Sequence, residues 1–166
     1  MADTTEKDAE IEARFWKALR SDMTVMLGLG SEIDQRPMTA QLEGKDDHGP
    51  IWFFGHTDSD LNEALGTGSK EAQFSFVDKG HTVWATVAGR LQVDNDRAMI
   101  DKLWNPYAAA WYEKGKDDPK LSLLRFDMDH AKIWKDGSSL VAGFLTLLGR
   151  DPKKDYQDNV AEIGAR

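Results

Sequence analysis

The chain has 166 residues, of which 40% are hydrophobic and 30% charged, and its formal net charge at pH 7 is -8. This composition fits one globular domain, and the acidic balance argues against nucleic acid or an anionic membrane surface as a partner, since both carry negative charge. The sequence contains no cysteine, which excludes disulfides, zinc–thiolate sites and thiol nucleophiles.

No stretch of the sequence reaches the roughly 18 uninterrupted apolar residues of a membrane-spanning helix. The longest apolar run, 140–148, is interrupted by Gly143 and Thr146. The N-terminus is acidic, whereas a secretory signal peptide carries positive charge ahead of an apolar segment. We therefore expect a soluble, cytoplasmic protein with no membrane partner.

The first half of the chain predicts one helix followed by a series of strands. Apolar side chains recur at helical spacing over residues 5–20. The pattern then changes to alternation, and residues 23–29, 36–43 and 51–54 are strand-like. A run of helix-capping residue types precedes a short helix expected at 61–65.

The second half continues with strands and short helices. Strands are predicted at 72–77 and 83–93, the second being the longest strand pattern in the chain. A helix begins after Asp94-Asn95 and is stopped by Pro106. The remaining predicted elements are a helical turn or two at 107–114, strands at 121–126 and 131–135, and an amphipathic helix at 140–148.

Together these elements describe a mainly β protein. Six or seven strands follow one another with helices in the connections, which favours an antiparallel Greek-key or meander β-barrel with helical insertions over a doubly wound parallel sheet. We assign residues 1–149 to a single domain with an N-terminal helix. Residues 150–166 are predicted to form a polar, mobile tail.

Several catalytic motifs are absent or incomplete. Residues 66–70 have the wrong order for a phosphate-binding P-loop, and residues 28–30 lack the third glycine of the dinucleotide fingerprint. No two histidines have the i,i+4 spacing of a helical metal motif, and no Gly-x-Ser-x-Gly sequence occurs. We therefore expect neither a metal site nor a hydrolytic triad, and the sequence identifies no catalytic residue.

One candidate site is the strand that begins at Arg36-Pro37. A residue before proline is held extended, and arginine offers a planar fork suited to phosphate. Met38 shares the face of Arg36, and its thioether can pack against a flat ring. The alternative is a surface ion pair at Arg36 and a core position for Met38.

A second candidate site follows the apolar strand that ends at Phe54-Gly55. Hydroxyl side chains at Thr57 and Ser59 lead into a helix start, where unpaired N–H groups favour an anion. The alternative is ordinary helix capping. The carboxylates at 58 and 60 oppose a phosphate there unless they point away.

A distinctive arrangement of aromatic and turn residues supports a family resemblance. It comprises Leu103-Trp104-Asn105-Pro106, Trp111-Tyr112, Asp117-Asp118-Pro119, residues 121–126, Ala131 and Trp134, together with Arg36-Pro37-Met38 and Ile51-Trp52-Phe53-Phe54. In order and spacing, these segments resemble the bacterial general stress proteins of the pyridoxamine 5'-phosphate oxidase-like class, which are flavin-binding split barrels. The resemblance covers about residues 8–148.

This resemblance implies a six-stranded FMN-binding split β-barrel that forms a homodimer, with the flavin in two equivalent clefts at the subunit interface. The implied cofactor-binding residues are Arg36, Pro37, Met38, Thr39, Gln41, Phe54, Gly55, Ser59, Leu61, Trp104, Trp111 and Trp134. For each of the three tryptophans, the alternative to cofactor binding is a purely structural role in the core of the dimer interface.

The sequence departs from the oxidases of this class at three positions. Gln41, Asp60 and Leu61 stand where the resemblance would place basic residues near the phosphate. Each charge-assisted contact to phosphate contributes about 1.5–3 kcal/mol. We therefore expect weaker FMN binding than in the oxidases, with FAD also admitted, and no oxidation of pyridoxamine phosphate.

Three functional hypotheses remain. The first is a flavin-dependent oxidoreductase of the stress response that takes hydride from a reduced nicotinamide or similar donor, a reaction that needs no protein nucleophile. The second is a flavin-binding protein without turnover that acts as a reservoir or sensor. The third is a dimer without ligand, whose aromatic residues serve the interface. His56 is a candidate acid or base only by its proximity in sequence.

Overall fold

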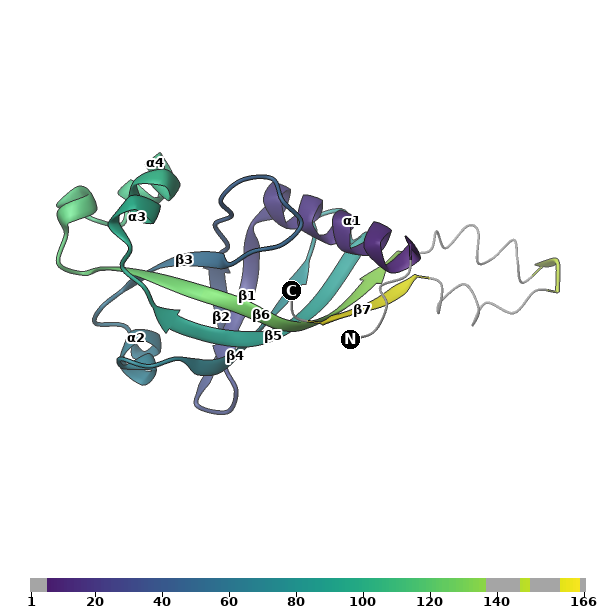
Figure 1. Ribbon diagram of the computed structural model, residues 1–166, viewed down its shortest axis with the longest axis horizontal. Coiled ribbons are helices and arrows are strands. Elements are labelled where there is room, and N and C mark those ends of the chain that lie inside the picture. Colours follow the sequence, from purple (N-terminus) through teal and green to yellow (C-terminus); the bar gives the residue numbers. More distant parts are fainter. Residues whose placement is uncertain (1–5, 137–146, 150–158, 165–166) are drawn as a thin grey trace.

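Seven antiparallel strands form one curled sheet in the part of the chain that the structure describes, residues 6–136, 147–149 and 159–164 of a computed structural model (Figure 1). The helices are α1 (Glu6–Asp22), α2 (Asp60–Leu65), α3 (Arg97–Leu103) and α4 (Pro106–Ala109), with a 3-10 turn η1 (Gly115–Asp117). The strands are β1 (Thr24–Leu29), β2 (Ile33–Thr39), β3 (Ile51–His56), β4 (Lys70–Val77), β5 (Val83–Val93), β6 (Leu121–Lys135) and β7 (Val160–Gly164).

The sheet closes on itself as a barrel. Its strands follow the order β2-β1-β4-β5-β6-β3, with β7 paired to β6 outside this path. The two ends of the order meet at a single bridge, where Gln41 N–H donates to Trp52 O at 2.7 Å and Trp52 N–H donates to Gln41 O at 2.9 Å. This architecture confirms the mainly β, antiparallel barrel with helical insertions that the sequence predicts.

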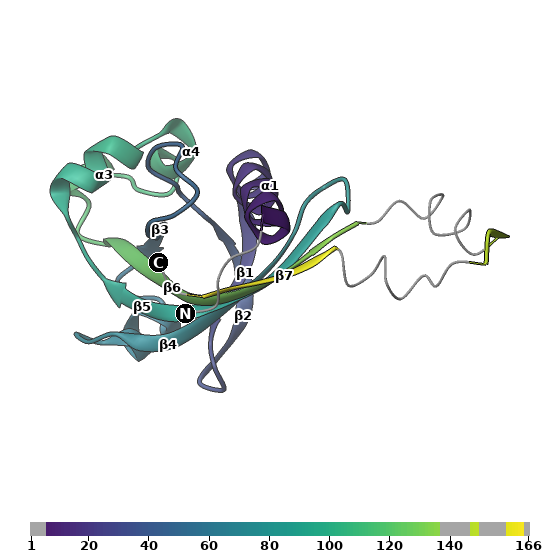
Figure 2. The same cartoon turned by 45° about the vertical axis from the view of Figure 1, so that its right-hand side comes forward.

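The barrel interior is filled by side chains that alternate along the strands. On β5, Val83, Ala85, Val87, Gly89 and Leu91 are buried, while the residues that alternate with them are exposed. Helix α1 covers one opening of the barrel (Figure 2), and its apolar stripe of Ile11, Phe15, Trp16 and Leu19 is completely buried in this core. None of the helices among the described residues is long and apolar enough to cross a membrane.

β6 is one continuous strand, although the sequence predicts two. The charged residues Asp127 and Asp129 lie between the two predicted strands. The backbone pairing with β5 nevertheless continues through Asp127 and His130, with Asp129 at a bulge. The register of this pair shifts between Ala88 and Gly89. At Gly89 an added Cβ would lie 2.2 Å from the carbonyl oxygen of Asp127, so only glycine fits this close approach.

The expectation of a mobile tail from residue 150 onward is wrong for residues 160–164. These residues form β7, which pairs with β6 so that Ile163 lies opposite Ala131. Ala161 and Ile163 are buried against α1 and the barrel core. Five residues with only two inward apolar side chains give a weak strand signal in the sequence. The strand forms because β6 provides the hydrogen-bonding partners and the apolar surface against which it packs. The helix expected at 140–148 lies almost entirely outside the described residues.

Candidate functional site

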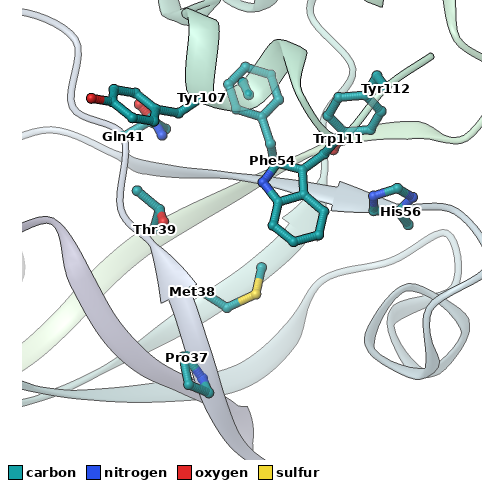
Figure 3. Close-up of a pocket in the computed structure, with 10 residues that line it drawn as sticks. Pro37, Met38, Thr39, Gln41, Phe54, His56, Tyr107, Trp111 and Tyr112 are labelled. Carbon is teal, nitrogen blue, oxygen red and sulfur yellow. The ribbon is translucent and has the colours of Figure 1, made fainter. Parts of the chain in front are cut away.

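A pocket of about 280 Å³ lies where β2, the end of β3, and α4 with the turn after it converge (Figure 3). It is lined by Pro37, Met38, Thr39, Gln41, Phe54, His56, Tyr107, Ala108, Trp111 and Tyr112. This volume is near the lower end of the range for small-molecule sites, and aromatic rings and a thioether form much of the wall. The pocket is therefore suited to a compact, flat ligand.

One side of the pocket is supplied by β2, an end strand in the sheet order. Met38 is half-buried against the barrel core and pairs with Val25 of β1. In Figure 3 its thioether points toward the indole of Trp111. Arg36 and Met38 are the less exposed residues of this segment, while Pro37 and Thr39 are exposed, as the predicted alternation requires.

The opposite side is supplied by β3, whose two faces have different roles. Phe54 and His56 project toward the pocket. Gly55 between them faces the other way, where an added Cβ would lie 3.1 Å from Oδ1 of Asn62. Asn62 donates to Oγ of Ser122 at 2.7 Å in the interior. Gly55 therefore allows α2 to pack closely on the barrel and does not line the pocket.

Tyr112 fixes the wall next to His56. Its hydroxyl donates a hydrogen bond to the carbonyl oxygen of Gly55 at 2.6 Å, and its ring stacks on His56 with 4.9 Å between centroids. Only 4% of Tyr112 is exposed. Burial, together with the nearby charge of Asp118, raises the pKa of Tyr112 to about 12. The phenol is therefore neutral at physiological pH and remains a hydrogen-bond donor.

The Asn-Pro motif positions the rim of the pocket. Oδ1 of Asn105 accepts from the backbone N–H groups of Tyr107 and Ala108, both at 3.0 Å, and Pro106 occupies the first turn. The short helix α4 and the turn after it present two large aromatic side chains to solvent, with Tyr107 86% and Trp111 72% exposed.

The Asp-Asp-Pro motif closes the segment after this rim. The carboxylate of Asp118 accepts from the backbone N–H groups of Lys120 at 2.9 Å and Lys114 at 3.1 Å. These two hydrogen bonds lower the pKa of Asp118. The segment is thereby tied to the start of β6.

A second hydrophobic cluster supports the pocket from behind. It consists of the buried residues Trp52, Ile100, Leu103, Tyr112, Leu121 and Leu123, with Phe54, Met99 and Trp104 packed against them. The Phe54 and Trp104 rings meet edge to face at 5.8 Å. Trp104 therefore supports a lining residue without lining the pocket itself.

Arg36 lies next to the pocket and is engaged by Asp60. Its Nη1 is 2.5 Å from Oδ1 of Asp60, and its Nη2 donates to Oδ2 at 2.7 Å. The hydrogen bonding raises the pKa of Arg36 and lowers the pKa of Asp60. This is the surface ion pair that the sequence left open as an alternative.

The start of α2 shows ordinary capping. Oγ of Ser59 accepts from the N–H of Asn62 at 3.1 Å, and Oδ1 of Asp60 accepts from the N–H of Leu61 at 2.8 Å. The side chain of Leu61 is buried in the barrel core. Neither Ser59 nor Leu61 lines the pocket.

The structure thus brings together part of the predicted set. The predicted residues that line the pocket are Pro37, Met38, Thr39, Gln41, Phe54 and Trp111. Those outside its lining are Arg36, Gly55, Ser59, Leu61, Trp104 and Trp134, the last of which lies opposite Trp84 in the β5–β6 pair.

Four lining residues were not among the predicted cofactor-binding residues: His56, Tyr107, Ala108 and Tyr112. Of these, the sequence gives a functional role only to His56, as a candidate acid or base. The period of a strand relates His56 to Phe54, and helical spacing relates Tyr107 to Trp111, so both signals were present in the sequence. Among the described residues, no group of three or more His, Asp or Glu side chains is arranged to hold a metal ion.

The pyridoxamine 5'-phosphate oxidase like family model matches residues 10–156. The general stress FMN/FAD binding protein from Xanthomonas citri is 53% identical, with 79% of this chain and 92% of that chain covered and a TM-score of 0.74. A general stress protein 26 from Jannaschia sp. CCS1 is 28% identical, with 95% and 99% covered and a TM-score of 0.76.

A shorter match relates the chain to General stress protein 26 of Bacillus subtilis. The two are 30% identical over 54 residues, which is 32% of this chain and 38% of that protein. The chain thus spans well under half the length of this curated relative. From the extent of the family match and the shared split-barrel fold, the chain belongs to the pyridoxamine 5'-phosphate oxidase-like family.

Proposed function

We propose that this chain binds a flavin, FMN or FAD, with the fused ring in the pocket between Met38, Phe54 and Trp111. The observation that carries the proposal is the chemistry of the walls, since a thioether and aromatic rings are suited to the faces of a flat ring. Thr39 and Gln41 add a hydroxyl and an amide that can hydrogen-bond to the polar edge of the ring. The FMN/FAD binding relative from Xanthomonas citri supports the same ligand class.

We further propose that the protein is a flavin-dependent oxidoreductase that uses a reduced nicotinamide or similar donor. The bound flavin would supply the hydride chemistry. The residues of the chain hold the ring and limit access of water, and the hydroxyl of Tyr112 is already committed to Gly55 O. His56 is the one histidine among the described residues that line the pocket.

Flavin binding without turnover is the second candidate function. It is favoured by the composition of the lining, which includes no Asp, Glu, Lys or Arg among the described residues. Anaerobic mixing of the flavin-loaded protein with NADH or NADPH separates the two functions. Bleaching of the flavin absorbance supports the oxidoreductase, and an unchanged spectrum supports a reservoir or sensor.

We propose that the pocket is completed in a homodimer. Tyr107 and Trp111 form an exposed aromatic rim beside the pocket, and exposed apolar patches of this kind commonly mark an interface. Analytical ultracentrifugation of the purified protein tests this assembly. A mass of one chain at all concentrations would contradict it.

Fluorescence titration with FMN, FAD and riboflavin tests the binding proposal. We expect Trp111→Ala to weaken flavin binding at least tenfold, because stacking of an aromatic side chain on a flat heterocycle contributes about 1–3 kcal/mol. Trp84→Ala is the matched control, since Trp84 lies outside the pocket lining and stacks on His81 of the turn before β5. Equal affinities of the two variants would overturn the assignment of this pocket.

A further inference from the structure

The ion pair between Arg36 and Asp60 has the geometry of a phosphate contact. Both terminal nitrogens of the guanidinium are used by one carboxylate, at 2.5 Å and 2.7 Å. A guanidinium binds phosphate through the same two-point arrangement. The carboxylate of Asp60 therefore occupies the positions that two oxygens of a ligand phosphate would take at Arg36.

Few other cations are available to an anionic ligand at this site. The described residues that line the pocket include no Lys or Arg. Among the residues adjacent to them in the chain, Arg36, which precedes Pro37, is the only one with a positively charged side chain. Arg36 is therefore the positive charge that the chain places directly beside the pocket lining.

The backbone donors beside Arg36 are also occupied by side chains of the protein. Asp60 accepts from the N–H of Leu61, and Ser59 accepts from the N–H of Asn62. The carboxylate of Asp60 thus accepts hydrogen bonds both from the guanidinium of Arg36 and from the backbone N–H of Leu61 at the start of α2. Both terminal nitrogens of the guanidinium contact the carboxylate of Asp60. The inner nitrogen, Nε, is buried and has no hydrogen-bond partner among the described residues.

We propose that Asp60 determines ligand specificity by neutralising Arg36, so that binding depends on the flavin ring and only weakly on a 5'-phosphate. This inference rests on the proposed flavin binding. A ligand phosphate must displace a carboxylate from Arg36 and remain near its negative charge, and these two effects offset the attraction of the guanidinium. Riboflavin, whose tail is neutral, is therefore expected to bind within about threefold of FMN, since a neutralised exposed charge contributes little.

The variant Asp60→Asn tests this inference. Asparagine keeps the size of the side chain and an oxygen for the N–H of Leu61, but it removes the negative charge that holds Arg36. We expect FMN binding to tighten about tenfold or more, the effect of one released charge-assisted contact. Riboflavin binding should change by less than about twofold, because it has no phosphate to use the released charge.

Asp58→Asn is the matched control. It removes the same charge two residues away, from a side chain that is equally exposed, at 63% against 62% for Asp60. Asp58 pairs with Lys120 at 3.6 Å instead of with Arg36. The affinities for FMN and riboflavin should therefore both stay unchanged in this variant.

The double variant Arg36→Gln/Asp60→Asn shows whether the gain comes from Arg36. It should lose the tightening of FMN binding seen in Asp60→Asn while keeping the affinity for riboflavin. The inference is overturned if Asp60→Asn leaves FMN binding unchanged, weakens it or changes both ligands equally, or if the double variant keeps the gain. If the unmodified chain and Asp60→Asn bind neither flavin, the proposed function itself fails, and the inference fails with it.

Discussion

The two faces of β3 belong to two different parts of the molecule. Ile51 and Phe53 point into the barrel and are fully buried in its core. Trp52 and Phe54, which alternate with them, point outward into the cluster beneath α3 and α4. One strand of six residues therefore serves the barrel on one face and the pocket on the other.

The difference between the faces separates stability from binding. The inner face is closed on all sides, so its side chains contribute mainly to the free energy of folding. The outer face is covered only in part, and Phe54 and His56 remain available to a ligand. Substitutions on the inner face should therefore unfold the protein, whereas substitutions on the outer face should change binding first.

The largest expected effect comes from Phe53→Ala. The ring of Phe53 is fully buried, and its removal should lower the free energy of unfolding by about 3–5 kcal/mol. Phe54→Ala is the control on the other face of the same strand, and it should lower stability by clearly less while weakening flavin binding. Urea unfolding of both variants measures the contrast. Equal losses would remove the distinction between the two faces.

Gly89→Ala should have the next largest effect, because it acts on the bulge that allows β5 and β6 to pair along their length. An alanine Cβ would lie 2.2 Å from the carbonyl oxygen of Asp127, so the backbone must shift. We expect a loss of at least about 1–3 kcal/mol in thermal or urea unfolding. Gly68→Ala is the control, since no atom lies within 4 Å of its added Cβ. If Gly89→Ala were as stable as this control, the bulge would not require glycine.

The barrel was largely predictable because its signals are local. The alternation over 83–93 matches β5, whose buried residues Val83, Ala85 and Val87 recur at every second position. β7 was not predictable, because Ala161 and Ile163 become a strand only against Ala131 and Ile133 of β6. The continuity of β6 between the two predicted strands likewise depends on its pairing with β5, which no local pattern reports.

The pocket was predictable only in part because it combines distant segments. Met38 and Phe54 follow from strand alternation, but the approach of Trp111 and Tyr112 depends on how α4 packs. The pairing of Arg36 with Asp60 depends on the position of α2, which the hydrogen bond between Asn62 and Ser122 fixes across 60 residues of sequence. The spacing of apolar residues within one segment cannot predict a contact between two such distant segments.

A smaller effect is expected from Tyr112→Phe, which changes the pocket wall and keeps its ring. The substitution removes the hydrogen bond to Gly55 O, which should cost about 0.5–1.5 kcal/mol of unfolding free energy. The stacking partner of His56 loses only its hydroxyl, so flavin affinity should fall less than in Trp111→Ala. Urea unfolding and flavin titration measure the two quantities. A loss of stability as large as that of Phe53→Ala would show that Tyr112 belongs to the barrel in energetic terms.

The last expected effect is in the pH dependence of stability, which tests whether the phenol of Tyr112 is buried in the folded chain. The pKa of Tyr112 is raised from 10.0 to about 12 in the folded chain. Between these values the unfolded chain loses this proton and the folded chain retains it, so unfolding releases a proton and stability falls as pH rises. Below pH 10 the contribution is fully present. Urea unfolding between about pH 10 and pH 12 should therefore show a decline that is shallower in Tyr112→Phe. Identical slopes in the two proteins would mean that the phenol of Tyr112 ionises equally in both states, which its burial and its contact with Gly55 O argue against.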